Sequence, residues 1–202
     1  MARRGMVIDL DRCVGCYSCI MACKVANGTP KGVFWTRVLE KEEGTFPNAR
    51  RTFLPVLCNH CENPACVEVC PTGATFKRDD GIVLIDYDKC NGCRYCMMAC
   101  PYDVRVFMDR IDGYFPSGQT PFEKVNEKKW QVGTVIKCTF CVERVDQGLD
   151  PVCVAICPTS ARIFGDLDDP KSPVSRLLGE RGSTQLRPEF GTNPSVYYLS
   201  TR

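Results

Sequence analysis

The chain has 202 residues, of which 44% are hydrophobic and 25% are charged; this is the balance of a globular protein and excludes extensive disorder. No stretch approaches the roughly 18 consecutive apolar residues of a membrane-spanning helix. The formal net charge is only +2, and no basic patch interleaved with aromatic residues indicates a nucleic-acid binder.

The amino-terminal segment contains two adjacent arginines and continues into a strand-like run at residues 6–9. Neither an apolar segment nor a small-residue cleavage site follows the arginines, so we expect no signal peptide. An Asp-Arg pair then precedes a run of closely spaced cysteines. The same order of strand, charged pair and cysteine run recurs at residues 82–100, and this repetition indicates two related units.

The segments between and after these runs are less regular. Apolar residues alternate over residues 32–57 around a Glu-Glu-Gly turn, which is typical of a β-hairpin. Residues 111–132 are rich in Gly, Pro and charge and are expected to form a surface loop. Return strands are expected at residues 105–108 and 161–164, and the last forty residues lack periodicity and are expected to form a tail.

Cysteine dominates the composition, with 16 residues or about 8% of the chain. The cysteines fall into four groups of four along the sequence. These are Cys13, Cys16, Cys19 and Cys23; Cys58, Cys61, Cys66 and Cys70; Cys90, Cys93, Cys96 and Cys100; and Cys138, Cys141, Cys153 and Cys157.

The first and third groups have the C-x2-C-x2-C-x3-C spacing of ferredoxins. Three thiolates two residues apart can each reach a different iron of one cubane, and the fourth points toward a neighbouring cluster. The fourth group alone would also suit structural zinc, and a disulfide framework would suit a small secreted domain. Because two ferredoxin-type runs share the chain and no group lacks a ligand, we predict four 4Fe–4S clusters.

Cluster binding would change the charge balance and the nature of the core. Each oxidised cluster with its four thiolates adds roughly −2, so four clusters would take the formal charge from +2 to about −6. We interpret the 26 Lys and Arg residues as compensation for these buried anions. Long apolar segments are few, so the clusters are expected to form the core and their ligation to drive folding.

Four residues beside the cysteines are candidates for setting cluster potentials. His60, the only histidine, lies between two ligands and is a candidate donor to its cluster; packing within the loop is the alternative. Lys24, Arg94 and Lys137 either raise cluster potentials through their charge or are simply solvated. We find no P-loop, dinucleotide fingerprint or nucleophile–base constellation, so we expect the chain to catalyse no substrate conversion by itself.

These motifs resemble the four-cluster iron–sulfur (beta) subunit of dimethyl-sulfoxide-reductase-type molybdenum oxidoreductases. The resemblance is closest to the small version in polysulfide, thiosulfate, tetrathionate and arsenate reductases. It rests on VIDLDRCVGCYSCIMACK, CNHCENPACVEVCPTGA, DYDKCNGCRYCMMACPYDVR and KCTFCVERVDQGLDPVCVAICPTSARIFGDLDDPKSPV. It covers nearly the whole chain, and sixteen cysteines in register make it highly specific.

The resemblance implies that each group exchanges its last cysteine with another group. The implied ligands are Cys13, Cys16, Cys19 and Cys157 for cluster 1; Cys23, Cys138, Cys141 and Cys153 for cluster 2; Cys58, Cys61, Cys66 and Cys100 for cluster 3; and Cys70, Cys90, Cys93 and Cys96 for cluster 4. It also implies that cluster 1 lies nearest the molybdenum subunit and cluster 4 nearest a quinone-exchanging membrane subunit.

The expected fold is therefore α+β, with two ferredoxin-like units whose clusters have crossed ligands. The expected parts are residues 1–31 with 133–164 as the first unit, 52–110 as the second unit, 32–51 as a β-hairpin insertion, 111–132 as an insertion loop, and 165–202 as an extended C-terminal tail that contacts a partner.

The expected function is electron transfer through four 4Fe–4S clusters. The implied partners are a molybdopterin (bis-guanine-dinucleotide) catalytic subunit and an integral membrane quinone-reactive subunit or other redox partner, in sulfur-compound or arsenate respiration. Alternatives are the corresponding subunit of a formate dehydrogenase or hydrogenase, a freestanding polyferredoxin, and a multi-zinc structural module. The resemblance implies a periplasmic location, reached by co-export with the catalytic subunit; a cytoplasmic location is the alternative.

Overall fold

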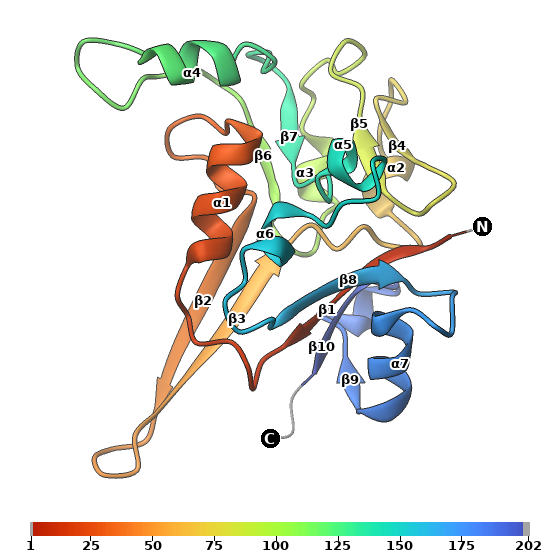
Figure 1. Cartoon of the computed structure of the whole chain (residues 1–202). Helices are drawn as coiled ribbons and strands as arrows, with labels where there is room; N and C mark the ends of the chain where they lie inside the picture. The colour runs from red at the N-terminus through yellow and green to blue at the C-terminus, as the bar shows by residue number, and fades with distance from the viewer. Residues whose placement is uncertain (1, 200–202) are drawn as a thin grey trace.

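The computed structural model describes residues 2–199, which form short strands and helices joined by long loops (Figure 1). The strands are β1 (Arg4–Asp9), β2 (Thr36–Glu43), β3 (Arg50–Leu57), β4 (Thr75–Lys77), β5 (Val83–Ile85), β6 (Arg105–Phe107), β7 (Val135–Lys137), β8 (Arg162–Asp166), β9 (Ser183–Thr184) and β10 (Val196–Leu199). The helices are α1 (Ser18–Asn27), α2 (Ala65–Glu68), α3 (Tyr95–Met98), α4 (Pro121–Asn126), α5 (Val142–Val145), α6 (Val152–Ala155) and α7 (Pro173–Glu180), with a 3-10 turn at Pro188–Phe190. None of the helices within residues 2–199 is both long and apolar enough to cross a bilayer.

The largest sheet joins the two ends of the described chain. Its strand order is β8-β1-β10-β9, with β1 antiparallel to β8 and parallel to β10. Met6, Val7 and Ile8 are fully buried, because β1 is covered on both faces. Val7 packs with Val174 of α7, whereas Met6 and Ile8 belong to the central core. A continuous apolar run is what a strand buried on both faces requires.

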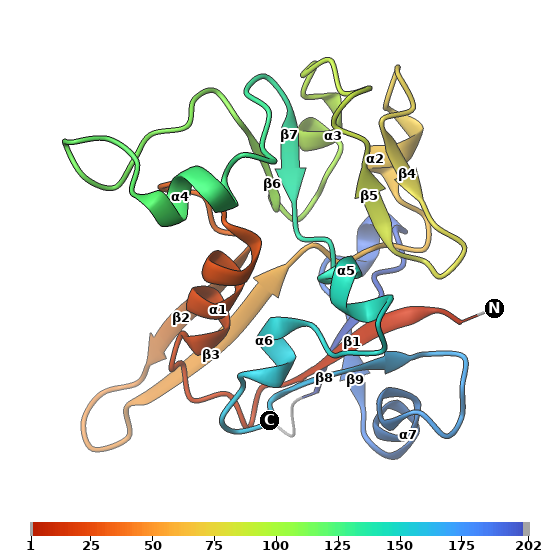
Figure 2. The same ribbon diagram turned by 45° about the horizontal axis from the view of Figure 1, so that its top comes forward.

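The expected extended tail at residues 165–202 is wrong over its described part. Strand β10 lies between β1 and β9, and Val196, Tyr198 and Leu199 are all buried. Helix α7 covers the sheet beside it (Figures 1 and 2). Strand β10 was missed because four residues show little periodicity, whereas α7 has a clear apolar face at helical spacing that was overlooked in the sequence.

An antiparallel hairpin of β2 and β3 extends away from the rest of the molecule (Figure 1). Its register pairs Thr36 with Leu57 and Glu43 with Arg50, so the expected boundary after residue 51 falls inside β3. The hairpin contacts the first cysteine loop at Gly15, where an added Cβ would lie 2.3 Å from the ring of Phe53. Strand β3 leads directly into the second cysteine group.

The insertion at residues 111–132 contains a short helix, α4, where a surface loop was expected. Thr120 begins the helix with a capping box: its hydroxyl accepts from the Glu123 amide, and the Glu123 carboxylate accepts from the Thr120 amide. Near the end of the segment, the buried indole of Trp130 donates to the carbonyl of Gly28. The insertion is therefore fastened to the end of α1.

The two expected units share secondary structure. Strand β6, in the second unit, pairs with β7, in the first, through residues 105–107 and 135–137. On the surface, the Arg78 guanidinium makes two hydrogen bonds of 2.7 and 3.0 Å to the carboxylate of Asp146. These contacts fix the relative positions of the two halves of the protein.

The buried end of β10 provides a test of its contribution to stability. Tyr198 donates a 2.8 Å hydrogen bond to the carbonyl of Pro55 in the hairpin. Tyr198→Phe leaves that carbonyl unpaired, which should lower the free energy of unfolding by about 1 kcal/mol. The apparent melting temperature of the cluster-loaded protein should then fall by about 2–4 °C. Tyr114→Phe, at an exposed tyrosine, is the matched control. Equal melting of both variants and the parent would contradict a structural role for β10.

Candidate functional site

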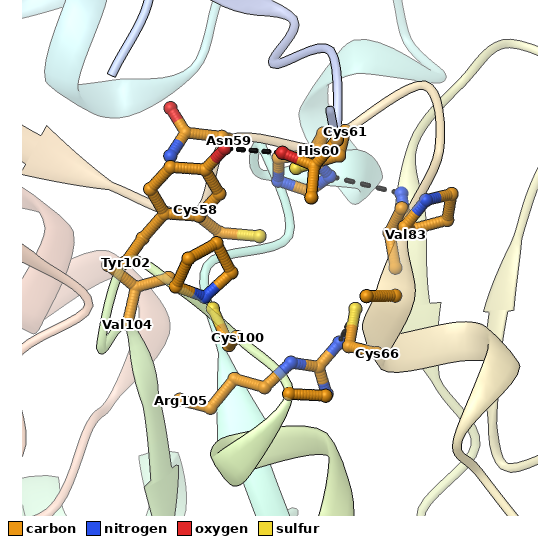
Figure 3. Close-up of a pocket in the computed structure, with 15 residues that line it drawn as sticks. Cys58, Asn59, His60, Cys61, Cys66, Val83, Cys100, Tyr102, Val104 and Arg105 are labelled. Atoms are coloured by element: carbon orange, nitrogen blue, oxygen red, sulfur yellow. Dashed lines mark hydrogen bonds between the residues drawn. The ribbon is translucent and has the colours of Figure 1, made fainter. Parts of the chain in front are cut away.

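One cavity is surrounded by four cysteines from two separate groups. Its lining includes Cys58, Cys61 and Cys66 from the second group and Cys100 from the third. Figure 3 shows these cysteines around a common space, with Arg105 at the edge beside Cys66. Cys58 follows β3 and Cys66 lies in α2, so a hairpin and a short helix bring distant thiols together.

A second cavity has the same composition in the other half of the protein. It is lined by Cys13, Cys16 and Cys19 of the first group and by Cys157 of the fourth. Sequence neighbours of Cys157, namely Pro158 and Thr159, also line it. Both cavities therefore combine three thiols of one run with the final thiol of another.

The cysteine loops adopt the same backbone in the two ferredoxin-type runs. Gly15 and Tyr17 have φ values of 65° and 59°, and the equivalent Gly92 and Arg94 have values of 69° and 64°. Left-handed residues between cysteines curl the loop, so that successive thiols face inward and backbone amides line a concavity suited to an anion. Glycine adopts this backbone without strain, whereas Tyr17 and Arg94 are held in it by the helices that they begin.

The remaining thiols also gather in sets. Cys23 lies close enough to Cys141 and Cys153 for their charges to interact, and Asn27 donates to the sulfurs of both Cys23 and Cys141, at 3.5 and 3.9 Å. Cys138 interacts with the same three cysteines. Elsewhere Cys96 interacts with Cys90 and Cys70, while Cys93 of the same run is exposed to solvent.

The donor set fits iron–sulfur clusters better than single metal ions. Among residues 2–199, no three Cys, His, Asp or Glu side chains converge as closely as one ion requires. The thiolates of a cubane need not converge on one point, because each binds a different iron. In addition, the cavity around Cys58 is lined by His60 and Asn59, whose buried Nε2 and side-chain amide atoms have no partner within the described chain. Such groups can donate to cluster sulfur.

Burial raises the pKa of eight of the sixteen thiols and makes them poor acids in the metal-free chain. It raises the pKa of Cys23 and of Cys61 to about 12, with repulsion from neighbouring thiolates adding to the effect. The pKa of the fully buried Cys138 is raised well above its ordinary value for the same reasons. Metal binding must therefore displace protons, and the binding energy contributes to folding.

Cys70 and Cys157 differ from these buried thiols. Burial raises the pKa of both thiols, but hydrogen bonds from backbone amides lower it by a larger amount. The net shift is therefore downward. The amide of Thr75 donates to Cys70 and that of Ala161 to Cys157, each at 3.3 Å. Each cysteine is the first residue of a Cys-Pro-Thr turn. The chain folds back after the turn, so that the amide of a following residue donates to the sulfur.

His60 is fully enclosed between the two halves of the protein. Its ring stacks on Phe140 with centroids 3.8 Å apart, and its Nδ1 accepts a 3.0 Å hydrogen bond from the amide of Val83. Burial and the nearby charges of Lys137 and Arg105 hold the pKa of His60 well below 6.5, against a smaller opposing effect of the Cys138 backbone. The ring is therefore neutral and, because Nδ1 accepts from Val83, it carries its proton on Nε2.

The three basic candidates occupy different environments. The Lys24 ammonium donates to the carbonyls of Thr29 and Pro30, at 2.9 and 2.8 Å, and so fastens the loop after α1. The exposed Arg94 guanidinium lies 3.7 Å from the ring centre of Phe107. Lys137 is buried and donates to the carbonyls of Val83 and Cys138. Of the three, only Lys137 is enclosed among the thiols.

Two further cations at the thiols were not predicted from the sequence. Arg105 and Arg162 are each only 3% exposed, and both contact cysteine sulfur or act on it through their charge. Each lies five residues after the last cysteine of its group, in the pattern C-P-x-x-x-R. This repeated pattern is visible in the sequence and could have identified them.

Comparison with known proteins gives the family. A family model described as a 4Fe-4S dicluster domain matches residues 49–114 and 116–167, and one described as a 4Fe-4S binding domain matches residues 4–25. An iron–sulfur protein assigned to a dimethyl sulfoxide reductase of Halobacterium salinarum is 49% identical over 99% of this chain and 80% of its own length.

Two further relatives agree. The arsenate respiratory reductase iron–sulfur subunit ArrB of Shewanella sp. (strain ANA-3) is 42% identical, over 98% of this chain and 96% of its own length. A subunit of the tetrathionate reductase of Salmonella typhimurium is 44% identical, over 98% and 72% respectively. The chain belongs to the family of 4Fe–4S electron-transfer subunits of dimethyl-sulfoxide-reductase-type molybdenum oxidoreductases.

Proposed function

We propose that this chain conducts electrons through four 4Fe–4S clusters in a single row, in the order 1-2-3-4, bound by the crossed ligand sets that the resemblance implies. The observation that carries the proposal is the gathering of fifteen of the sixteen thiols, from four sequence groups, into neighbouring sets. When bound, the clusters supply one-electron redox chemistry. The chain positions them, excludes water and sets their potentials.

The order of the row is supported by contacts between sets. Cys138, proposed for cluster 2, interacts electrostatically with Cys58, proposed for cluster 3, which makes these the adjoining inner clusters. Cys153 of cluster 2 interacts with Cys19 of cluster 1. At the other end, Arg105 acts on both Cys66 of cluster 3 and Cys96 of cluster 4.

Exposure supports the assignment of the two ends. Cys16, proposed for cluster 1, and Cys93, proposed for cluster 4, are exposed, whereas every thiol proposed for cluster 2 is buried. Electrons can therefore be exchanged with partners at clusters 1 and 4 and not in the middle of the row. The buried thiols of cluster 2 protect it from solvent.

For the partners, we propose a molybdopterin catalytic subunit beside cluster 1 and a quinone-reactive membrane subunit beside cluster 4. Relatives of this chain are named as subunits of arsenate and tetrathionate reductases, which supports a catalytic partner of that class. The family resemblance favours a location on the periplasmic face of the membrane, reached together with the catalytic subunit.

Crossed ligation can be tested by pairs of substitutions. Anaerobically purified protein should contain about 16 iron and 16 sulfide per chain, four from each cubane. Cys13→Ala with Cys157→Ala removes two ligands from one proposed cluster and should abolish that cluster alone, leaving about 12 iron. Cys13→Ala with Cys23→Ala, in one sequence group, removes one ligand from each of two proposed clusters and should alter two sets of electron paramagnetic resonance (EPR) signals.

The reverse result, two clusters altered by the first pair and one by the second, would contradict the crossed assignment. A colourless preparation containing zinc and no iron would contradict the function as well. The two double variants carry the same kind of change, so each serves as the control for the other.

The direction of the row can be tested at its exposed end. Cys93→Ser should convert or remove only cluster 4, because that cysteine is the exposed ligand proposed for it. Quinone-linked turnover of the purified complex should stop, while turnover with an artificial dye at the catalytic subunit should persist. Cys16→Ser is the matched variant at the opposite end. Equal loss of both activities in Cys93→Ser would contradict the proposed order.

A further inference from the structure

Two buried arginines occupy equivalent places in the two halves of the protein. Arg105 begins β6 and Arg162 begins β8, each five residues after a cysteine that is followed by proline. The turn between cysteine and arginine has a left-handed residue at the same position in both halves, with φ of 50° at Asp103 and 49° at Ser160. Because the two turns have the same backbone, each buried arginine lines the cavity of its own half of the protein.

Arg105 lies between two sets of thiols. Its Nη2 donates a 2.8 Å hydrogen bond to the sulfur of Cys66, and its Nη1 is 3.4 Å from the hydroxyl of Thr75. Its charge also stabilises the thiolate of Cys96, to which it makes a further hydrogen bond. Cys66 and Cys96 are proposed ligands of clusters 3 and 4, so one guanidinium reaches both.

Arg162 has the matching position between clusters 1 and 2. Its Nη2 donates a 2.9 Å hydrogen bond to the hydroxyl of Thr36, which fixes the side chain. Its charge acts on Cys19, proposed for cluster 1, and on Cys153, proposed for cluster 2, with a side-chain hydrogen bond to the latter. A threonine hydroxyl and two thiol sets thus surround each arginine.

The charges make this placement significant. A guanidinium is not deprotonated in proteins, so Arg105 and Arg162 both carry a positive charge. No carboxylate is paired with either guanidinium by a salt bridge among the described residues. The thiolates are therefore their counter-ions, and when a cluster gains an electron its negative charge increases. A fixed, buried cation stabilises the reduced state more than the oxidised one, with little screening by solvent.

We propose that Arg105 and Arg162 are intercluster cations, each of which raises the reduction potentials of the two clusters that it separates. This inference rests on the proposed ligand sets. Lys137 contacts the remaining junction: it donates to the carbonyl of Cys138, proposed for cluster 2, and its charge acts on Cys66, proposed for cluster 3. Buried cations therefore alternate with anionic clusters along the row.

The proposal is tested by removing one charge at a time. Arg105→Gln and Arg162→Gln each delete a buried charge while keeping a hydrogen-bond donor, and Arg105→Lys and Arg162→Lys keep the charge. Arg110→Gln makes the same charge change at a side chain that is 76% exposed and ion-paired with Asp112. Each protein is purified anaerobically, analysed for iron and sulfide, and titrated with mediators while the EPR signals of its clusters are followed.

In Arg105→Gln, two of the four reduction potentials should fall, each by about 59 mV or more, which is a tenfold lower ratio of reduced to oxidised cluster at a fixed potential. In Arg162→Gln the other two should fall instead. The Lys variants and Arg110→Gln should stay close to the parent.

Fully loaded Gln variants with unchanged potentials would overturn the proposal, as would an equal shift of all four clusters. If the Gln variants fail to load iron while the Lys variants load fully, the arginines act only in cluster assembly and the proposal is overturned. These results differ from failure of the proposed function, which would appear as a parent protein without about 16 iron per chain.

Discussion

The structure depends on bringing mutually repelling thiolates together in a protein interior. Burial alone raises the pKa of these thiols, so the metal-free chain opposes the arrangement that its function needs. Iron overcomes this opposition by replacing protons, while backbone amides and buried cations offset the negative charge that remains. Curled cysteine loops, C-P turns and internal arginines all serve the same electrostatic requirement.

Much of the site could be predicted from the sequence because ligand spacing is a local property. Cysteines at fixed intervals predicted iron–sulfur chemistry, and the resemblance of the motifs around them predicted the family; the relatives confirm both. Short strands beside the cysteine runs were also predicted, since β-branched residues follow one another there. The assignment of individual thiols to clusters remains a proposal, because it depends on contacts between distant segments.

The failures have a common physical origin. Strand β10 is short and gains its stability from packing against β1, so its local sequence contains little information; α7 has an apolar face in its sequence, but the sheet that it covers was not predicted. Arg105 and Arg162 were overlooked because arginine is ordinarily a surface residue, and only the enclosed thiolates make its burial favourable. Lys24 was weighed as a charge near a cluster, although its ammonium is held by backbone carbonyls.

The position of β10 has a consequence for biosynthesis. Because residues 196–199 lie beside residues 6–9 in the centre of the large sheet, β1 cannot pair on both sides until residue 199 has been synthesised and has left the ribosome. Until β10 is in place, β1 has only β8 beside it, so the sheet next to the first and fourth cysteine groups is incomplete.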